Sequence, residues 1–178
     1  TFDIKDDYVV YIGRIDESKG CKEMFEYFLE YKKTYNSNLK LVLAGKSAME
    51  IPRNKDIIAL GFVSEEEKVN LIRKSKLLVL PSKFESLSLS TLEAMYLEVP
   101  VLLNGQCEVL KKHAILSNAG LYFENKYEFI EALNFMINHP EIMKTMSKNG
   151  IKYVENNYKW NVVMRKLKKA IEILSFKF

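Results

Sequence analysis

Residues 77–103 read LLVLPSKFESLSLSTLEAMYLEVPVLL, and this stretch decides the fold. The apolar run LLVLP (77–81) predicts a buried strand, STLEAMYLE (90–98) a helix, and VPVLL (99–103) a second strand. A strand, a helix and a strand in this order form a βαβ unit, whose two strands lie parallel. The polar loop at 82–89 is therefore expected at the carboxyl end of the first strand.

The same alternation extends to both sides of this unit. Further strands are predicted at 8–12, 39–45, 57–61 and 120–123. Helices are predicted at 21–35, from a capping box at Ser64 and Glu67 through about 74, and from Lys126 onward with breaks near Pro140 and Tyr158. The pattern predicts an α/β fold: a Rossmann-like, doubly wound parallel sheet of about six strands with additional C-terminal helices.

The composition suits one domain. The chain has 178 residues, 48% of them hydrophobic, and a net charge of +4. The charge is mild and mixed, so nucleic acid is not expected as a partner, whereas an anionic ligand or an anionic membrane surface is allowed. No apolar run is long enough to span a membrane.

The start of the chain and its two cysteines bear on where the protein is located. The chain starts without Met and without a signal peptide, so we expect an excised fragment. Cys21 and Cys107 stand alone, which predicts neither a zinc site nor a disulfide framework. We expect a cytoplasmic protein, with a place at the inner face of the membrane left open.

The loop GRIDESKG (13–20) follows the first predicted strand. In a doubly wound sheet, ligands bind beyond the carboxyl ends of the strands. Arg14 and Lys19 therefore suit a phosphate or diphosphate at that edge. The loop is neither a Walker A loop nor a GxGxxG fingerprint, and two solvated loop charges are the alternative.

The loop at 82–89 carries a second set of polar groups. Glu85 precedes the predicted helix and Glu93 lies inside it, with seven residues between them. Ser88 or Ser90 is expected to cap the helix, whose N-terminus is an anion site. A carboxylate can accept two hydrogen bonds from the vicinal hydroxyls of a sugar. The alternative is a surface glutamate and an acid that favours the helix dipole.

Several motifs now stand in one order: YIGRIDESKG, LVLAG, GFVSEEE, LVLPSKFES…LEAM and VPVLLNGQCEVL. Together they resemble the C-terminal domain of retaining family-4 (group 1) glycosyltransferases of the GT-B fold. The resemblance runs from about Val9 to Leu133. Each motif alone is weak, but their order and strand context are specific.

The resemblance implies roles for individual residues. It implies that Arg14 and Lys19 hold the donor diphosphate and that Glu85 lies near the donor hexose, so these three are the catalytic candidates. Glu93 is expected on the ribose hydroxyls. The donor-nucleotide-binding candidates are Gly13, Gly61, Phe62, Val63, Ser88, Leu89 and Glu93. No metal ligand and no cofactor are expected, with the nucleotide-diphosphate-sugar as substrate.

The resemblance also implies an activity, the transfer of a hexosyl group from a nucleotide-sugar to an acceptor hydroxyl with retention, in glycan or glycolipid biosynthesis. It implies that residues 1–178 are one nucleotide-sugar-binding domain. The glycan, lipid-linked or protein acceptor binds through an N-terminal domain that is absent here. We expect this chain alone to be inactive.

The sequence departs from the family at glycine positions. The family segment E-G-F-G reads ESLS (85–88), and the glycine of E-A-M-A-x-G-x-P-V is Glu98. A serine at a position that needs positive φ is strained. For this reason a non-catalytic nucleotide-binding module stays open. A sugar-nucleotide epimerase or hydrolase of the same fold is a second alternative, whose acid/base carboxylates and His would lie in the absent domain.

Other side chains fit less specific roles. Asn104, Gln106 and Glu108 contact the sugar or cap a helix, and His113 is expected to be structural or solvated. A C-terminal stripe either reaches the absent domain or packs on its own sheet; it consists of Trp160, Val163, Leu167, Ile171 and Leu174. A basic cluster lies on a solvated helix face or makes peripheral contact with anionic lipid; it consists of Arg165, Lys166, Lys168 and Lys169.

Overall fold

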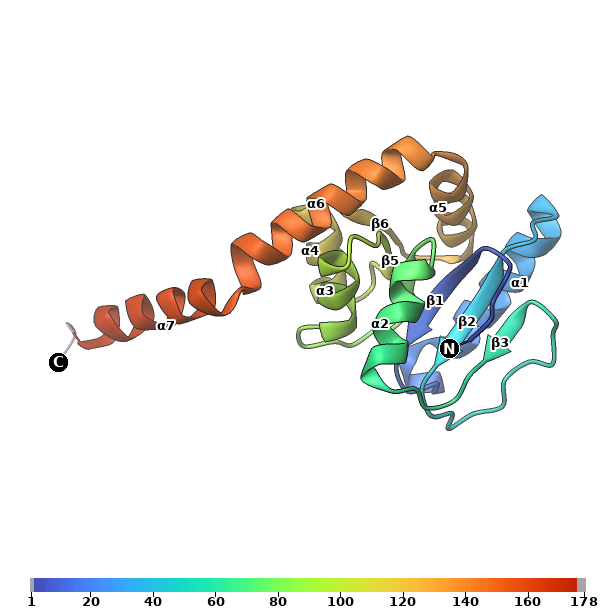
Figure 1. Cartoon of the computed structure of the whole chain (residues 1–178), viewed down its shortest axis with the longest axis horizontal. Helices are drawn as coiled ribbons and strands as arrows, with labels where there is room; N and C mark the ends of the chain where they lie inside the picture. Colours follow the sequence, from blue (N-terminus) through green and yellow to red (C-terminus); the bar gives the residue numbers. More distant parts are fainter. Residues whose placement is uncertain (1, 176–178) are drawn as a thin grey trace.

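A computed structural model describes residues 2–175 of the chain, and a parallel sheet forms its centre (Figure 1). The strands are β1 (Tyr8–Ile12), β2 (Lys40–Ala44), β3 (Ile57–Ala59), β4 (Leu78–Leu80), β5 (Val101–Asn104) and β6 (Gly120–Phe123). Their order in the sheet is β3-β2-β1-β4-β5-β6, and every pair is parallel. The predicted α/β fold with six strands is confirmed.

Helices cover both faces of this sheet. They are α1 (Cys21–Tyr35), α2 (Glu65–Lys74), α3 (Leu89–Tyr96), α4 (Glu108–Ser117), α5 (Lys126–Asn138), α6 (Pro140–Tyr158) and α7 (Trp160–Ser175), with a 3-10 turn at Glu17–Lys19. In Figure 1, α2 and α3 lie in front of the sheet and α1 lies behind it, where it packs against α5. This is the arrangement that right-handed crossovers impose on a parallel sheet.

The strand order reverses between β1 and β4. From β1 the chain moves outward to β2 and β3, and then returns to pair β4 with the other side of β1. A doubly wound sheet binds its ligand at this switch point, beyond the carboxyl ends of the strands. The loops after Ile12 and after Leu80 therefore meet at the place where a site is expected.

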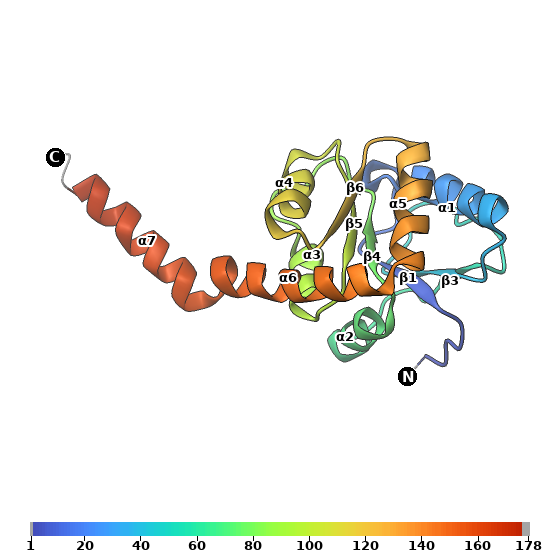
Figure 2. The same cartoon turned by 90° about the horizontal axis from the view of Figure 1, so that it is seen from above.

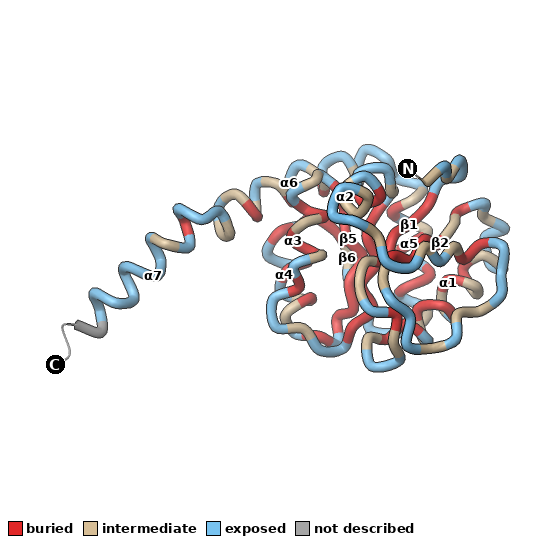
Figure 3. The backbone as a smooth tube through the Cα atoms, turned by 60° about the horizontal axis from the view of Figure 1, so that its bottom comes forward, coloured by how far each residue is buried: buried red, intermediate tan, exposed pale blue. Residues whose placement is uncertain are grey.

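The central strands are mainly apolar because both of their faces are buried. Figure 3 shows the strands mainly as buried, whereas α7 is largely exposed. Val9, Val10 and Leu41 in the sheet have no exposed surface. Continuous burial explains why apolar runs, rather than alternating patterns, marked the strands in the sequence.

Local signals explain where individual elements start. Ser64 and Glu67 form the predicted capping box of α2: the Ser64 hydroxyl accepts a hydrogen bond from the Glu67 N–H, and the Glu67 carboxylate from the Ser64 N–H. The sequence pattern did not predict the helix α4. Its segment carries Lys111, Lys112 and His113 in succession, and this polar run hides the apolar face that the helix buries.

The last two helices extend beyond the sheet. Figures 1 and 2 show α6 crossing the domain and α7 projecting away from it. Trp160 and Leu167 on α7 are 78% and 50% exposed, so the alternative in which their stripe packs on the sheet of this domain is wrong. The Leu174 side chain lies outside the described residues. Within residues 2–175, no helix combines the length and apolar character that a membrane crossing requires.

Glu98 occupies the strained conformation that its glycine position suggested. Its φ is +60°, in the left-handed region, and its side chain is exposed. Replacing Glu98 by Gly is expected to raise the free energy of unfolding by about 1 kcal/mol, because the penalty of a Cβ in this region disappears. Urea denaturation measures this gain.

Asn36 supplies the matched control for that substitution. It is also exposed and has a φ of +46°, but Asn tolerates the left-handed region better than Glu. Asn36→Gly is therefore expected to give a smaller gain. If Glu98→Gly does not raise the free energy of unfolding above that of the parent chain, the backbone of Glu98 is not strained.

Candidate functional site

The predicted loops meet at the carboxyl edge of the sheet and bind one another through their backbones. The Gly13 N–H donates to Ala44 O at 3.0 Å, and the Gly45 N–H donates to Gly61 O at 2.7 Å. The Asn104 side chain donates to Pro81 O at 2.8 Å. These bonds join the ends of β1, β2, β3, β4 and β5 into one rim.

A cavity of about 580 Å³ lies on this rim, between the loops that follow β1 and β4. Six of the predicted site residues line it: Gly13, Arg14, Lys19, Glu85, Ser88 and Leu89. The other four, Gly61, Phe62, Val63 and Glu93, lie outside its lining. A hollow of about 660 Å³ adjoins it and shares Lys19, Glu85 and Ser86.

Lys19 and Glu85 form an ion pair in the wall of this cavity. The Lys19 ammonium donates to Glu85 Oε1 at 2.8 Å, although 66 residues separate them in the chain. Lys19 ends the 3-10 turn, which the Asp16 carboxylate caps by accepting from the Ser18 N–H. Two of the three catalytic candidates are thus in direct contact.

The backbone of Arg14 is fixed by a hydrogen bond, whereas its side chain is mostly exposed to solvent. The Tyr11 hydroxyl donates to Arg14 O at 2.6 Å, which fixes the loop. The Arg14 side chain is 60% exposed, and its Nε lies 3.3 Å from Asp16 Oδ2. Among residues 2–175 this is the one ion pair of the guanidinium, which can therefore turn to an anion in the cavity at little cost.

Ser88 starts α3 in an unusual conformation. Its φ is +59°, and its hydroxyl lies 2.7 Å from the Thr91 hydroxyl rather than on a backbone N–H. The predicted capping bond from the Ser88 hydroxyl is therefore wrong, because the left-handed backbone turns the side chain to Thr91. Of the two serines at family glycine positions, Ser88 has positive φ and Ser86 does not.

Glu93 lies further along α3, where Lys68 of α2 binds it. The Lys68 ammonium donates to Glu93 Oε1 at 3.0 Å and lies 2.7 Å from Glu65 Oε2. Burial lowers the pKa of Lys68, but the hydrogen bonds to both carboxylates outweigh burial and raise that pKa above its usual value. No sequence pattern predicts a role for Lys68, because its partner lies 25 residues away on another helix.

The segment between β3 and α2 reaches the same edge of the domain. Gly61 joins the rim through its carbonyl, and the Phe62 ring beside it is 78% exposed. Val63 is half-buried against the core. These three residues border the rim without lining the cavity.

Polar residues at and after the end of β5 hold the rim together. Asn104 is buried and also accepts from the Gln106 N–H at 2.9 Å, while Gln106 donates to Glu124 O at 2.7 Å. Glu108 is the first residue of α4 and pairs with Lys112. All three side chains thus have partners within the domain, and Gln106 and Glu108 also line the adjoining hollow.

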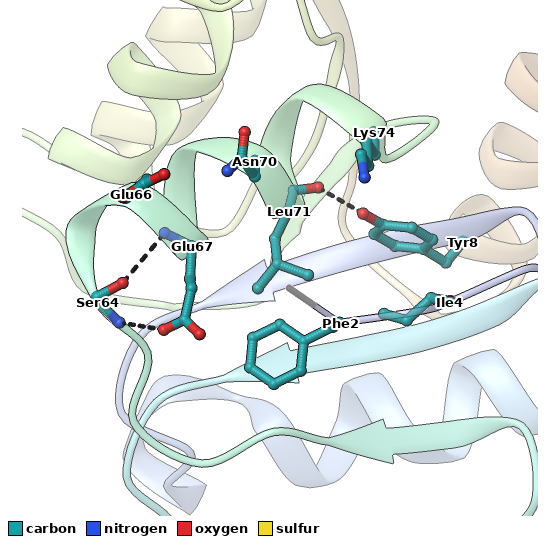
Figure 4. Close-up of a pocket in the computed structure, with 9 residues that line it drawn as sticks. All are labelled: Phe2, Ile4, Tyr8, Ser64, Glu66, Glu67, Asn70, Leu71 and Lys74. Atoms are coloured by element: carbon teal, nitrogen blue, oxygen red, sulfur yellow. Dashed lines mark hydrogen bonds between the residues drawn. The ribbon is translucent and has the colours of Figure 1, made fainter.

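Another cavity lies away from the rim, between α2 and the N-terminal segment (Figure 4). It holds about 310 Å³ and is partly closed by Phe2 and Ile4. The Tyr8 hydroxyl in it donates to Leu71 O at 2.8 Å. In residues 2–175, no three His, Cys, Asp or Glu side chains come together as a metal site requires.

Comparisons with known proteins agree with this architecture. The model of the family "Glycosyl transferases group 1" matches residues 1–153. A Xenopus tropicalis protein, glycosyltransferase 1 domain-containing protein 1, is 33% identical over 95 residues, which cover 52% of this chain and 26% of that protein. The capsular polysaccharide biosynthesis glycosyltransferase CapM of Staphylococcus aureus is 24% identical over 92% of this chain and 46% of its own length.

A solved structure shows the same fold. Anabaena HepE in complex with UDP and glucose superposes with a TM-score of 0.77 at 16% identity, over 94% of this chain and 48% of that one. The chain therefore spans less than half the length of each of these three proteins.

Proposed function

Because this chain belongs to the group 1 glycosyl transferases, we propose that it forms the donor-binding part of a glycosyltransferase. The enzyme moves a hexosyl group from a nucleotide-sugar to an acceptor hydroxyl, with retention of configuration. One observation carries the proposal: Arg14, Lys19 and the start of α3 line one cavity at the switch point of the sheet. Two cations and a helix N-terminus are the groups that bind a diphosphate.

The proposed chemistry depends on charge that grows on the leaving diphosphate. Lys19 stabilises this charge from a position fixed by its ion pair, and Arg14 turns toward it from the rim, so no metal ion is needed for that purpose. Glu85 orients Lys19 through their ion pair and lies beside the donor hexose. Nearby, the backbone N–H groups of Ser88 and Leu89 approach the phosphates.

The nucleoside extends along the rim from this cavity. Glu93 accepts hydrogen bonds from the ribose hydroxyls, and Lys68 holds its carboxylate in place. Gly61, Phe62 and Val63 border the base. HepE was solved in complex with UDP and glucose, which makes UDP the first nucleotide to test here.

The acceptor is a glycan, a lipid-linked sugar or a protein, bound through a further domain of the whole protein. The name of CapM places that relative in capsular polysaccharide biosynthesis, and we propose a role in glycan or glycolipid synthesis in the cytoplasm. The exposed stripe of α7 then docks on the acceptor domain. Its basic cluster, Arg165, Lys166, Lys168 and Lys169, offers contact with anionic lipid at the inner face of the membrane.

The alternative of a non-catalytic module rested on the lost glycines. Ser88 nevertheless keeps the positive φ that a glycine would supply, at +59°. Ser88 therefore adopts a backbone conformation that glycine favours, which supports an active donor site over a degenerate one.

Glu93→Ala is expected to weaken UDP binding by about 10- to 100-fold, because a charged acceptor for the ribose hydroxyls is lost. Titration calorimetry with UDP, GDP and ADP measures the affinity and identifies the base. The 2′-deoxy form of the nucleotide that binds is titrated alongside it. The parent chain is expected to prefer the ribose form, and Glu93→Ala to lose this preference.

Glu66→Ala is the matched control, because Glu66 is exposed on α2 and lines the other cavity. Its affinity for UDP is expected to equal that of the parent chain. No binding of any of the three nucleotides at millimolar concentration contradicts the proposed function.

A further inference from the structure

His113 is a buried titratable side chain that the proposed donor site does not use. It lies in α4 and is 4% exposed. Its Nε2 is 2.9 Å from Leu87 O, and its Nδ1 is 3.0 Å from the Tyr153 hydroxyl oxygen. One ring thus connects the loop that lines the donor cavity to α6.

The hydrogen bonds define which ring nitrogen carries the proton. A carbonyl oxygen only accepts, so Nε2 must donate to Leu87 O. Burial lowers the pKa of His113 more than the bond to Leu87 raises it, so the ring is neutral near pH 7. Nδ1 then accepts from the Tyr153 hydroxyl, which lies 3.4 Å from the Tyr158 hydroxyl.

This chain of donors ends at the peptide bond between Leu87 and Ser88. The peptide is trans, so its C=O and N–H point in opposite directions. With the Leu87 carbonyl held by His113, the Ser88 N–H points away from that ring. Ser88 lines the cavity, and its N–H donates to no other described residue.

The conformation of Ser88 also has to be held by its surroundings. A φ of +59° is unfavourable for a residue with a Cβ, so neighbouring groups must fix it. Three contacts do this within the described chain: the Thr91 hydroxyl on the Ser88 side chain, the Leu92 N–H on the Ser88 carbonyl, and His113 on the preceding carbonyl.

We infer that His113 is a positioning residue of the donor site: it anchors the Leu87 carbonyl so that the Ser88 N–H is presented to the donor diphosphate. The inference rests on the proposed function. His113 itself touches neither the donor nor the acceptor. Its expected role as a structural side chain is therefore retained, with a specific consequence for the site.

Titration of UDP, GDP and ADP into His113 variants tests this inference. His113→Leu is expected to bind the preferred nucleotide about tenfold more weakly, because the Leu87–Ser88 peptide loses its anchor. His113→Gln places an amide N–H near the position of Nε2 and is expected to recover the affinity to within about threefold.

Tyr8→Phe is the matched control. It also removes a buried hydroxyl that donates to a backbone carbonyl, Leu71 O at 2.8 Å, but far from the donor loop. Tyr8→Phe is expected to lower the free energy of unfolding and to leave the nucleotide affinity unchanged. A His113→Leu protein that behaves in the same way overturns the inference.

The NMR resonance of the Ser88 amide tests the inference in a second and more direct way. It is expected to shift on addition of UDP in the parent chain and to stay in place in His113→Leu. If His113→Leu does not fold, Tyr153→Phe replaces it, since it removes the hydroxyl that fixes the ring; about threefold weaker binding is expected. Equal affinity in Tyr153→Phe then overturns the inference.

The two failures are distinguishable. Normal nucleotide binding in all His113 and Tyr153 variants removes the positioning role and leaves the proposed function standing. A parent chain that binds no nucleotide removes the proposed function and this inference with it.

Discussion

Replacing Lys19 by Met is expected to lower the kcat of sugar transfer by the whole protein by about 10²- to 10³-fold. The Lys19 ammonium sits in the cavity wall, 2.8 Å from Glu85, where the pair fixes its position before the donor binds. A cation held in this way stabilises the charge on the leaving diphosphate without further reorganisation. Met keeps an unbranched side chain of nearly the same length but removes the ammonium, and with it the ion pair to Glu85. Steady-state kinetics measure the effect.

Lys83 is the control for this substitution. It follows β4 on the same rim and forms a similar ion pair, with Glu23 at 3.0 Å. It lines the adjoining hollow but not the donor cavity. Lys83→Met is therefore expected to keep kcat within about twofold of the parent value. Equal losses from Lys19→Met and Lys83→Met contradict a specific role for Lys19.

Gly45→Ala is expected to destabilise the domain by about 3 kcal/mol. Gly45 has a φ of +148°, and a Cβ there would collide with the Gly13 carbonyl oxygen and lie 2.7 Å from the Gly13 carbonyl carbon. Both neighbours are backbone, so no side chain can move aside. The collision displaces the loop that begins at Gly13, and Arg14 with it. Urea denaturation measures the loss, and UDP affinity is expected to fall in parallel.

Gly61→Ala is the control that distinguishes the steric collision at Gly45 from backbone strain. The φ of Gly61 is +70°, also in the region that favours glycine, but no atom lies within 4 Å of a Cβ placed there. Gly61→Ala is expected to lower the free energy of unfolding by only about 1 kcal/mol. Similar losses at Gly45 and Gly61 would mean that backbone strain alone accounts for the effect.

The sequence predicts the sheet well because the strands are buried on both faces. Apolar runs at β1 and β6 coincide with the predicted ranges, and the capping box at Ser64 marks the start of α2. The helix α4 is missed because its buried face includes His113 rather than another apolar side chain. A polar residue that is buried through specific hydrogen bonds has no signature in an apolar pattern.

The site is predicted less completely than the fold. The loops that carry Arg14, Lys19 and Glu85 follow from the strand ends, and the structure brings them together. The contacts of Lys68 with Glu93 and of His113 with Leu87 join residues on different elements, so no spacing reveals them. They depend on how helices pack, which the order of residues along the chain does not state.

A crystal structure of the chain with UDP, or with GDP or ADP if one of these binds more tightly, tests the donor site most directly. The diphosphate is expected within hydrogen-bonding distance of Lys19, Arg14 and the Ser88 N–H, with the ribose hydroxyls on Glu93. A nucleotide bound instead in the cavity between α2 and the N-terminal segment would contradict the proposed site. So would a diphosphate that leaves the ion pair of Lys19 with Glu85 intact and touches neither Lys19 nor Arg14.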